Sequence, residues 1–251
     1  MTRASWMRLA AACVLMAPGI RAADEPLPKA ETILDRFVEV SGGKAAYEKR
    51  KSEVVTMEVE FVGRGIKGTM TRYADSSGNA YSEGEFEGIG KIQEGVYNGQ
   101  AWDLNPMTGA RLKTGLEGSD AVRDASMDAQ VNWRKYYKAE TVGIEKIGDE
   151  DAYKVTLTPV SEGKPQTDWF SKKTGFLIKT ARTVSNPMGE IPMEMTVGGY
   201  SKIGDLFYAK KISNSIMGTE MAITLQSVKT NEEIPKSRFE PPAEVKKLIA
   251  K

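Results

Sequence analysis

The chain has 251 residues, of which 40% are hydrophobic and 27% are charged. These values are ordinary for a globular protein, so they exclude a disordered chain and a membrane bundle, and the length suits one β-rich domain. Lysine and arginine total 35 against 34 aspartate and glutamate residues, which leaves no basic field to attract nucleic acid. Histidine is absent and Cys13 is the only cysteine. The commonest general base, the commonest metal ligand and a disulfide framework are therefore all missing.

The N-terminal segment is typical of an export signal. Two arginines precede an apolar stretch from Leu9 to Ile20, and the small residue Ala22 follows at a suitable cleavage site. We expect residues 1–22 to be a signal peptide and residues 23–251 to be a single periplasmic domain. The apolar stretch is too short to span a bilayer. The alternatives are a transmembrane anchor and lipid modification of Cys13.

The predicted elements begin with one amphipathic helix and continue as a series of strands. Apolar residues at helical spacing predict a helix from Ala30 to Val38, and the segment Ser41-Gly42-Gly43 ends it. From Ser52 the period changes to two residues, which places four apolar side chains on one face of a strand: Val55, Met57, Val59 and Phe61. Further strands are expected at 67–74, 79–86, 91–97 and 101–104, the last two joined by the hairpin signal Asn98-Gly99.

A second helix is expected to interrupt the strands between Ser119 and Ala139. Ser119 is a suitable N-cap, and an apolar stripe follows it: Val122, Ala125, Ala129, Trp133 and Tyr136. Strands resume at 141–147, 152–158, 166–171, 176–184, 191–200, 207–215 and 220–229. The short connections favour antiparallel neighbours, and no Pro-, Gly- or Ser-rich boundary divides the chain.

Three motifs have the spacing of enzyme or metal sites but lack their context. The glycines of segment 63–68 match a dinucleotide fingerprint, yet a strand pattern follows where that fingerprint needs a helix N-terminus. Segment 161–164 has the Ser-x-x-Lys spacing of penicillin-binding enzymes, but its glycine and the next proline predict a turn. The carboxylates of Glu83, Glu85 and Glu87 and of 149–151 could hold calcium, although alternating charge favours a solvated outer face. We therefore expect no enzymatic step, no cofactor and no metal.

Methionine is concentrated in the late strands, at Met188, Met193, Met195, Met217 and Met221. A flexible thioether adapts to irregular partners, so a Met-rich apolar surface suits contact with variable ligands. Ordinary filling of a protein core is the alternative.

One long segment carries a resemblance to a known family. Asp168-Trp169-Phe170-Ser171-Lys172-Lys173-Thr174-Gly175-Phe176-Leu177-Ile178-Lys179 resembles the outer-membrane lipoprotein-sorting family, the LolA-like and LolB-like carriers, in which a strand, a turn with Thr-Gly or Asp-Gly and a second strand recur. Three further segments, 97–102, 152–159 and 234–242, also resemble this family, and the segments follow one another in the family's order. The resemblance covers most of the mature chain.

The resemblance implies a mainly β fold with helices: an incomplete antiparallel β-barrel, or curved sheet, that encloses a hydrophobic cavity under a lid of helices. Ligand-binding residues would be Val55, Met57, Val59, Phe61, Ile191, Met193, Met195 and Val197 on the inner faces, with Trp133 at the mouth. The implied function is a periplasmic carrier for lipid or lipoprotein acyl chains. A sensor or interaction domain that binds envelope proteins on the same face is the first alternative, and an unrecognised hydrolase is the second.

Overall fold

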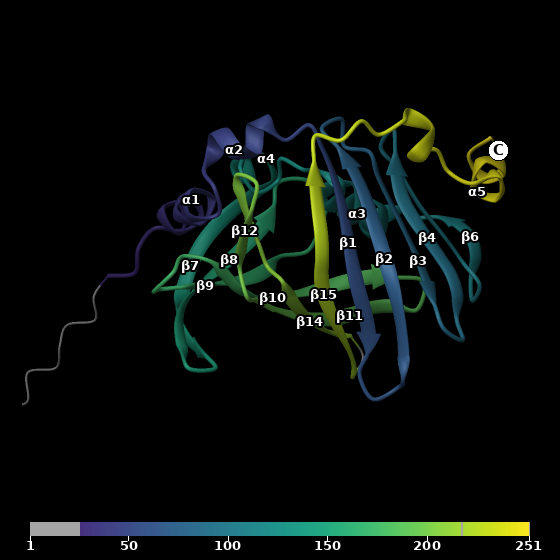
Figure 1. Cartoon of the computed structure of the whole chain (residues 1–251). Helices are drawn as coiled ribbons and strands as arrows, with labels where there is room; N and C mark the ends of the chain where they lie inside the picture. Colours follow the sequence, from purple (N-terminus) through teal and green to yellow (C-terminus); the bar gives the residue numbers. More distant parts are fainter. Residues whose placement is uncertain (1–25, 217, 251) are drawn as a thin grey trace, which may run out of the picture.

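A curved sheet of 13 strands dominates the computed structural model, which describes residues 26–216 and 218–250 (Figure 1). The strands before the helical connection are β1 (Ser52–Phe61), β2 (Ile66–Asp75), β3 (Ala80–Phe86), β4 (Gly90–Tyr97), β5 (Gln100–Asn105) and β6 (Gly109–Leu112). Those after it are β7 (Tyr137–Ile147), β8 (Glu150–Pro159), β9 (Gln166–Ser171), β10 (Leu177–Asn186), β11 (Gly189–Gly198), β14 (Lys211–Ile216) and β15 (Thr219–Thr230). A separate hairpin consists of β12 (Ser201–Ile203) and β13 (Leu206–Tyr208).

The large sheet consists of two antiparallel meanders that share one seam. Its order is β6-β5-β4-β3-β2-β1-β15-β14-β11-β10-β9-β8-β7, so the last strand in the chain returns to pair with the first. The edges of the sheet are therefore β6 and β7, which are neighbours in the chain but lie at opposite ends of the sheet. The chain between them has to cross the open side of the curved sheet.

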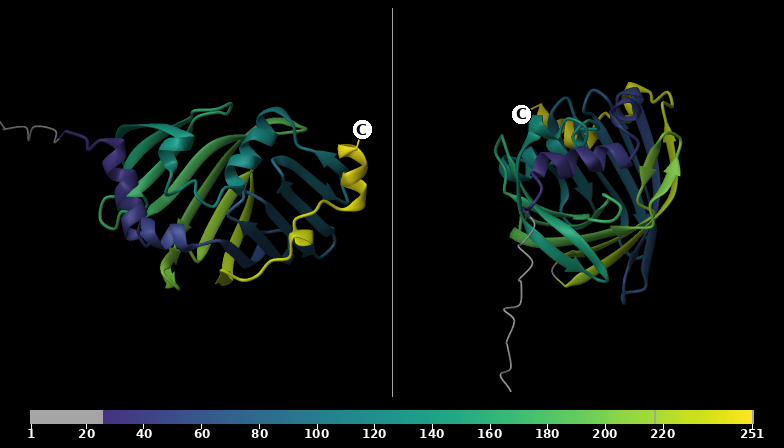
Figure 2. Two further views of the ribbon diagram at one scale, coloured as in Figure 1. Left: turned by 90° about the horizontal axis from the view of Figure 1, so that it is seen from above. Right: turned by 90° about the vertical axis from the view of Figure 1, so that its left-hand side faces the viewer.

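Helices α3 (Gly115–Ala125) and α4 (Trp133–Tyr136) lie in that crossing, and together with α1 (Ala30–Val40) they cover the open side. The other helices of the described chain are α2 (Lys44–Lys49), α5 (Ala243–Ile249) and the 3₁₀ turn η1 (Lys236–Arg238). The connection from β6 to β7 contains α3 and α4. Helix α3 contacts β4 and β5 in one arm of the sheet and β10 in the other. The sheet is thus a trough, and α1, α3 and α4 lie across its opening (Figure 2).

Small side chains let α3 approach the sheet closely. Ala121 and Ala125 of the helix pack against Ala80, Val96 and Ala101 on the concave face. Larger residues at these positions would hold the helix away from the sheet, because packed interiors leave little free volume. The other end of the trough is filled by α1 and Trp133, which pack against β8 and β9 in a buried cluster: Ala30, Ile33, Leu34, Trp133, Val155, Leu157 and Phe170.

The convex face of β3 and β5 is sealed by the C-terminal segment. Phe239 and Val245 pack against Tyr81 and Trp102, and the Trp102 side chain is 0% exposed. This cluster faces away from the trough, because Tyr81 and Trp102 alternate with the concave residues Ala80 and Ala101 along their strands.

The predicted fold class is confirmed: the chain is mainly β, and its antiparallel sheet curves without closing. The first helix and most strands lie where the sequence predicts them. The Asn98-Gly99 hairpin is also confirmed, with φ of 49° and 77° at the two residues, the pair of positive angles that a type I′ turn requires. Helices α2 and α5 and strands β6 and β12 were not predicted. The predicted signal peptide, residues 1–22, lies outside the described residues.

The prediction of one helix between Ser119 and Ala139 is wrong. Helix α3 starts earlier, with Thr114 as its N-cap, and ends at Ala125, after which Ser126 is extended with ψ of 115°. The Asp128 carboxylate then accepts hydrogen bonds from the Ser126 hydroxyl, from Tyr136 OH at 2.6 Å and from Asn132 Nδ2 at 2.9 Å. Such bonds compete with the helical backbone pattern and hold this stretch in a non-helical loop.

The predicted strand 207–215 is also corrected. Its first residues belong to β13, which pairs with β12 in the small hairpin, and only Lys211–Ile216 joins the large sheet as β14. The Tyr208 hydroxyl donates to Glu53 Oε2 at 2.7 Å. This bond holds the end of the small hairpin against the start of β1.

Candidate functional site

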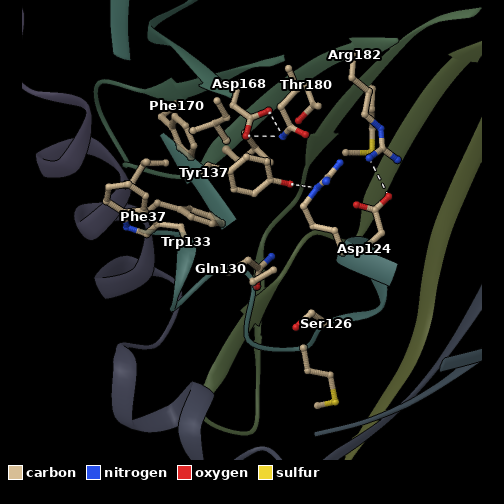
Figure 3. Close-up of a pocket in the computed structure, with 18 of the residues that line it drawn as sticks. Phe37, Asp124, Ser126, Gln130, Trp133, Tyr137, Asp168, Phe170, Thr180 and Arg182 are labelled. Atoms are coloured by element: carbon tan, nitrogen blue, oxygen red, sulfur yellow. Dashed lines mark hydrogen bonds and ion pairs between the residues drawn. The ribbon is translucent and has the colours of Figure 1, made fainter. Parts of the chain in front are cut away.

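A cavity of about 420 Å³ lies between the concave face of the sheet and the helices that cover it (Figure 3). This volume is within the range of pockets that bind small molecules. Strands β8 to β11 and helices α1 and α4 provide most of its apolar lining: Leu34, Phe37, Trp133, Leu157, Phe170, Met193 and Met195. One side of the cavity is therefore mainly a hydrocarbon and aromatic surface.

A buried carboxyl group stands on this lining. Asp168 of β9 is 6% exposed, and Gln166 Nε2 donates to both of its oxygens at 3.2 Å. Burial raises the pKa of Asp168 to about 6, although hydrogen bonds from Thr180 and Gln166 and the charge of Arg182 lower it. The cavity thus contains a carboxyl group that is half protonated in mildly acidic solution.

An ion pair to β10 and a hydrogen bond to β2 hold α3 against both arms of the trough. At the end of the helix, Asp124 Oδ2 accepts from Arg182 Nη1 of β10 at 2.8 Å, and Asp124 O accepts from Arg72 Nη2 of β2 at 3.2 Å. Arg123 is paired with Asp120 and donates from Nε to Tyr137 OH at 3.1 Å. The attachment of α3 is consequently more polar than that of α1.

The apolar surface continues beyond the cavity along the concave face of β1, β2, β4, β11, β14 and β15. Residues that are paired across neighbouring strands point to the same side of a sheet, and the register places one set of half-buried apolar residues on the cavity side: Val55, Met57, Phe61, Ile66, Met70, Ile92, Val197, Ile212, Ile216, Met221 and Ile223. We call this set the concave floor. Its members are neither sealed from solvent, as core residues are, nor exposed on a convex surface.

Aromatic rings end the floor at the β1–β2 side. The rings of Phe61 and Phe86 meet edge to face with centroids 5.8 Å apart. Phe86 lies flat because its neighbours are glycines: a Cβ atom would come within 2.5 Å of the ring at Gly68 and within 2.8 Å at Gly84. Glycine at these two positions is therefore a packing requirement of the floor.

The structure brings the eight sequence-predicted strand residues onto one face. Residues that lie opposite each other on neighbouring strands form a row from Phe61 of β1 through Met221 and Asn214 to Met195 of β11. A second row runs from Val59 through Ile223 and Ile212 to Val197. Of the predicted residues, Met193, Met195 and Trp133 line the cavity, Val59 and Ile191 are buried, and the others lie on the concave floor: Val55, Met57, Phe61 and Val197. Their role in ligand binding remains a prediction.

Two features of the site differ from the sequence analysis. Val122 was placed on the inner stripe of the second helix, but it is 37% exposed, and Arg123 is the buried neighbour instead. The polar residues of the cavity were not predicted. Gln166, Asp168 and Phe170 alternate along β9, and this alternation in a strand with a buried face was the available signal.

Metal-ligand groups and membrane-spanning helices were sought among the described residues. Among those residues, no group of three or more His, Cys, Asp or Glu side chains could hold a metal ion. No helix in the same residues has the length and apolarity needed to cross a bilayer.

Comparisons with known proteins agree on the fold. The sequence matches no protein-family model and no curated protein. A LolA superfamily protein from Nitrosomonas europaea aligns with a TM-score of 0.58 at 14% identity, covering 86% of this chain and 99% of that one. A DUF1329 family protein from Desulfovibrio piger aligns with a TM-score of 0.57 at 14% identity, covering 84% and 97%. An outer-membrane lipoprotein-sorting protein domain from Vibrio parahaemolyticus gives 0.51 at 13% identity, covering 82% and 97%.

These alignments span nearly the whole of each solved structure, so they concern the complete architecture and not one shared hairpin. The chain therefore has a LolA-like fold, as the sequence resemblance predicted. At this level of identity the likeness extends to the fold alone, and function has to be argued from the site.

Proposed function

We propose that this protein binds and carries an acyl-bearing molecule, a lipid or a lipoprotein, outside the cytoplasm and without a covalent step. The observation that carries the proposal is the concave floor, an apolar surface that is continuous with the cavity and only half buried. A soluble protein rarely leaves so many apolar side chains together in contact with solvent unless a partner covers them. Outer-membrane lipoprotein sorting, by transfer of the bound acyl chains, is the narrower form of the proposal.

The shape of the site suits acyl chains. The cavity accepts one acyl chain between Trp133, Phe170 and Met193, and the floor, which reaches to Phe61, offers apolar contact to a further chain of the same molecule. Met57 and Met70 face each other across β1 and β2 in the middle of this path. Flexible thioethers adapt to chains of different length and saturation.

The chemistry of the cavity supports binding in preference to hydrolysis. Ser126 lines the cavity and bonds to Asp128, the pair that comes nearest to a nucleophile and base. Burial raises the pKa of Asp128, but hydrogen bonds from Ser126, Tyr136 and Asn132 outweigh it and lower the pKa to about 2. A carboxylate with so low a pKa is a poor base near neutral pH, so it does not activate the serine hydroxyl.

The direct test is native mass spectrometry of protein recovered from the envelope of its own host, followed by titration of delipidated protein with a fluorescent palmitoyl probe. We expect a stoichiometric acyl lipid in the first experiment and saturable binding in the second. A bound peptide in place of lipid would favour the sensor or interaction alternative, and turnover of the bound acyl ester would contradict the absence of a covalent step.

Adjacent residues of β2 provide matched variants for the titration. Met70 belongs to the concave floor, whereas Thr69 points to the opposite face and is exposed. We expect Met70→Glu to abolish probe binding, because a carboxylate on the floor makes burial of an acyl chain costly. Thr69→Glu should bind as the unmodified protein does. Equal binding by both variants would place the ligand elsewhere.

A further inference from the structure

We infer that Asn214 is a specificity-determining residue that selects acyl chains joined through an amide, whose N–H group donates a hydrogen bond to Asn214 Oδ1. The inference rests on the proposed function and names the class of ligand. It starts from the one amide side chain on the part of the concave face formed by β11, β14 and β15.

Asn214 is surrounded by apolar neighbours. It lies on the concave side of β14, between Ile212 and Ile216 on its own strand. Across the neighbouring strands it is paired with Met195 of β11 and Met221 of β15. Packing alone would favour a fifth apolar residue at this position, because burying an amide among hydrocarbon groups is unfavourable unless it is hydrogen-bonded.

The oxygen of this amide is buried without a partner. Asn214 Oδ1 has no hydrogen-bond partner among the described residues. Six other buried side-chain atoms also lack a partner among the described residues. Those of Arg50, Asp103, Arg111 and Arg182 belong to groups that form ion pairs, and Trp102 Nε1 and Thr141 Oγ1 lie on strands away from β14. Asn214 has no such pair. A buried acceptor without a partner is unfavourable, so a ligand that brings a donor to this oxygen gains affinity from the new hydrogen bond.

The position of Asn214 relative to the cavity sets where that donor lies. Its neighbour Met195 lines the cavity, and adjacent strands are about 4.8 Å apart. A ligand whose acyl chain fills the cavity therefore carries the linkage of that chain over β14, and the floor beyond β14, toward Phe61, is left for a further chain of the same ligand. Met195 and Met221 flank the oxygen, and their flexible side chains can move aside to admit the linkage.

An amide linkage fits this oxygen and an ester linkage does not. A secondary amide offers an N–H donor beside its acyl chain, whereas the ester of the same shape has only acceptors. With an ester the buried Oδ1 stays without a donor, and it faces and repels the ester oxygen. We therefore expect the protein to prefer the amide by about 5- to 20-fold in Kd, the factor that one hydrogen bond to a buried group supplies.

The test compares two ligands that differ at one atom: N-palmitoylglycine methyl ester, and the methyl ester of O-palmitoyl glycolic acid, in which oxygen replaces N–H. Displacement of a fluorescent palmitoyl probe gives Kd for each, with the unmodified protein, Asn214→Leu and the control Ser215→Ala, which changes the exposed neighbour on the opposite face of β14. We expect the unmodified protein and Ser215→Ala to prefer the amide. Asn214→Leu should bind both ligands alike and, without ligand, should melt at a higher temperature because the unpartnered oxygen is gone.

The possible failures are distinguishable. Equal affinity of the unmodified protein for the two ligands would overturn the role of Asn214 and leave the proposed function standing, as would an unchanged amide preference in Asn214→Leu. Failure of both ligands and of the probe to bind would overturn the proposed function itself. If Asn214→Leu does not fold, the ligand pair still decides with the unmodified protein alone.

Discussion

The two faces of the sheet at β2 to β5 use apolar residues in opposite ways. On the convex face, Trp102 and Tyr81 are sealed by the chain's own C-terminal segment, through Phe239 and Val245. On the concave face, Met70 and its neighbours on the floor are only half buried. The C-terminal segment seals the convex cluster, whereas on the concave face α3 covers Ala80, Val96 and Ala101 and leaves the floor half covered.

This difference separates residues that stabilise the fold from residues that are kept free for a partner. A sealed cluster contributes burial and close packing to the free energy of unfolding. A half-covered surface contributes less until a ligand completes it, and the ligand then stabilises the folded state in proportion to its concentration and affinity. Substitutions on the two faces should therefore have different effects with and without ligand.

The largest expected effect is on the sealed face. Trp102→Ala should lower the free energy of unfolding by about 3–5 kcal/mol, because it removes a fully buried aromatic side chain and leaves a cavity. Urea unfolding followed by circular dichroism measures it. Met70→Ala, on the floor, should cost clearly less in the same assay. Equal losses would mean that the floor is an ordinary core.

Two methionines of β11 extend the comparison to ligand binding. Met193 is 7% exposed, whereas Met195 is half buried beside the cavity. Met193→Ala should lower the free energy of unfolding by about 2–5 kcal/mol and Met195→Ala by less. Met195→Ala should instead reduce the rise in melting temperature that an acyl ligand produces more than it lowers the ligand-free value. If Met195→Ala greatly lowers the melting temperature without ligand, while the rise produced by the ligand stays unchanged, Met195 belongs to the core.

The buried carboxyl of the cavity should make stability depend on pH. The pKa of Asp168 is about 6 in the folded protein against an ordinary value of 3.8. Between these values the folded state holds more protons than the unfolded state, so stability falls as pH rises from about 4 to 6 and stays low above it. Asp168→Asn should remove this fall and raise the free energy of unfolding at pH 7.5 by up to about 3 kcal/mol.

Urea titrations at pH 4.5 and pH 7.5 measure the effect of Asp168→Asn, which should be largest at the higher pH. A variant that is less stable than the unmodified protein at pH 7.5 would show that the carboxylate is stabilised by its neighbours. The raised pKa would then be incorrect.

The smallest expected effect is at the polar attachment of α3. Asp124→Asn should weaken the ion pair with Arg182 and lower the free energy of unfolding by about 0.2–1 kcal/mol, because the Asp124 side chain is 43% exposed. Hydrogen exchange is the sharper measurement: amides of α3 should exchange faster while those of α1 are unchanged. Equally faster exchange in both helices would mean that α1 and α3 open together.

The strands were largely predictable because apolar residues alternate along most of them, as Val55 to Phe61 do on β1, and the short connections favoured antiparallel neighbours. The pairing of β15 with β1 was not predicted. The Asn98-Gly99 turn was predictable from its own two residues. The break after Ala125 was not, since it depends on bonds from Ser126 and Tyr136 to Asp128 across a loop.

The cover of the convex face was not predictable for a related reason. Phe239 is an isolated apolar residue in a polar, proline-containing segment, and the helical spacing of Val245 with Leu248 and Ile249 covers too few residues to mark them as core. The charged residues of the cavity also escaped prediction. Arg182 and Asp124 are distant in sequence, and only the curvature of the sheet brings them together.

The central claim is that the concave floor and the cavity form one acyl-binding surface, and photocrosslinking tests it most directly. A palmitoyl probe with a diazirine near the end of its chain is bound to the protein, activated by light and located by mass spectrometry of the peptides. Crosslinks should fall on concave residues of β1, β2, β11 and β15 and on the Trp133 segment, and should disappear when unlabelled palmitate competes. Crosslinks concentrated on the convex face or the C-terminal segment, or insensitive to competition, would contradict the claim.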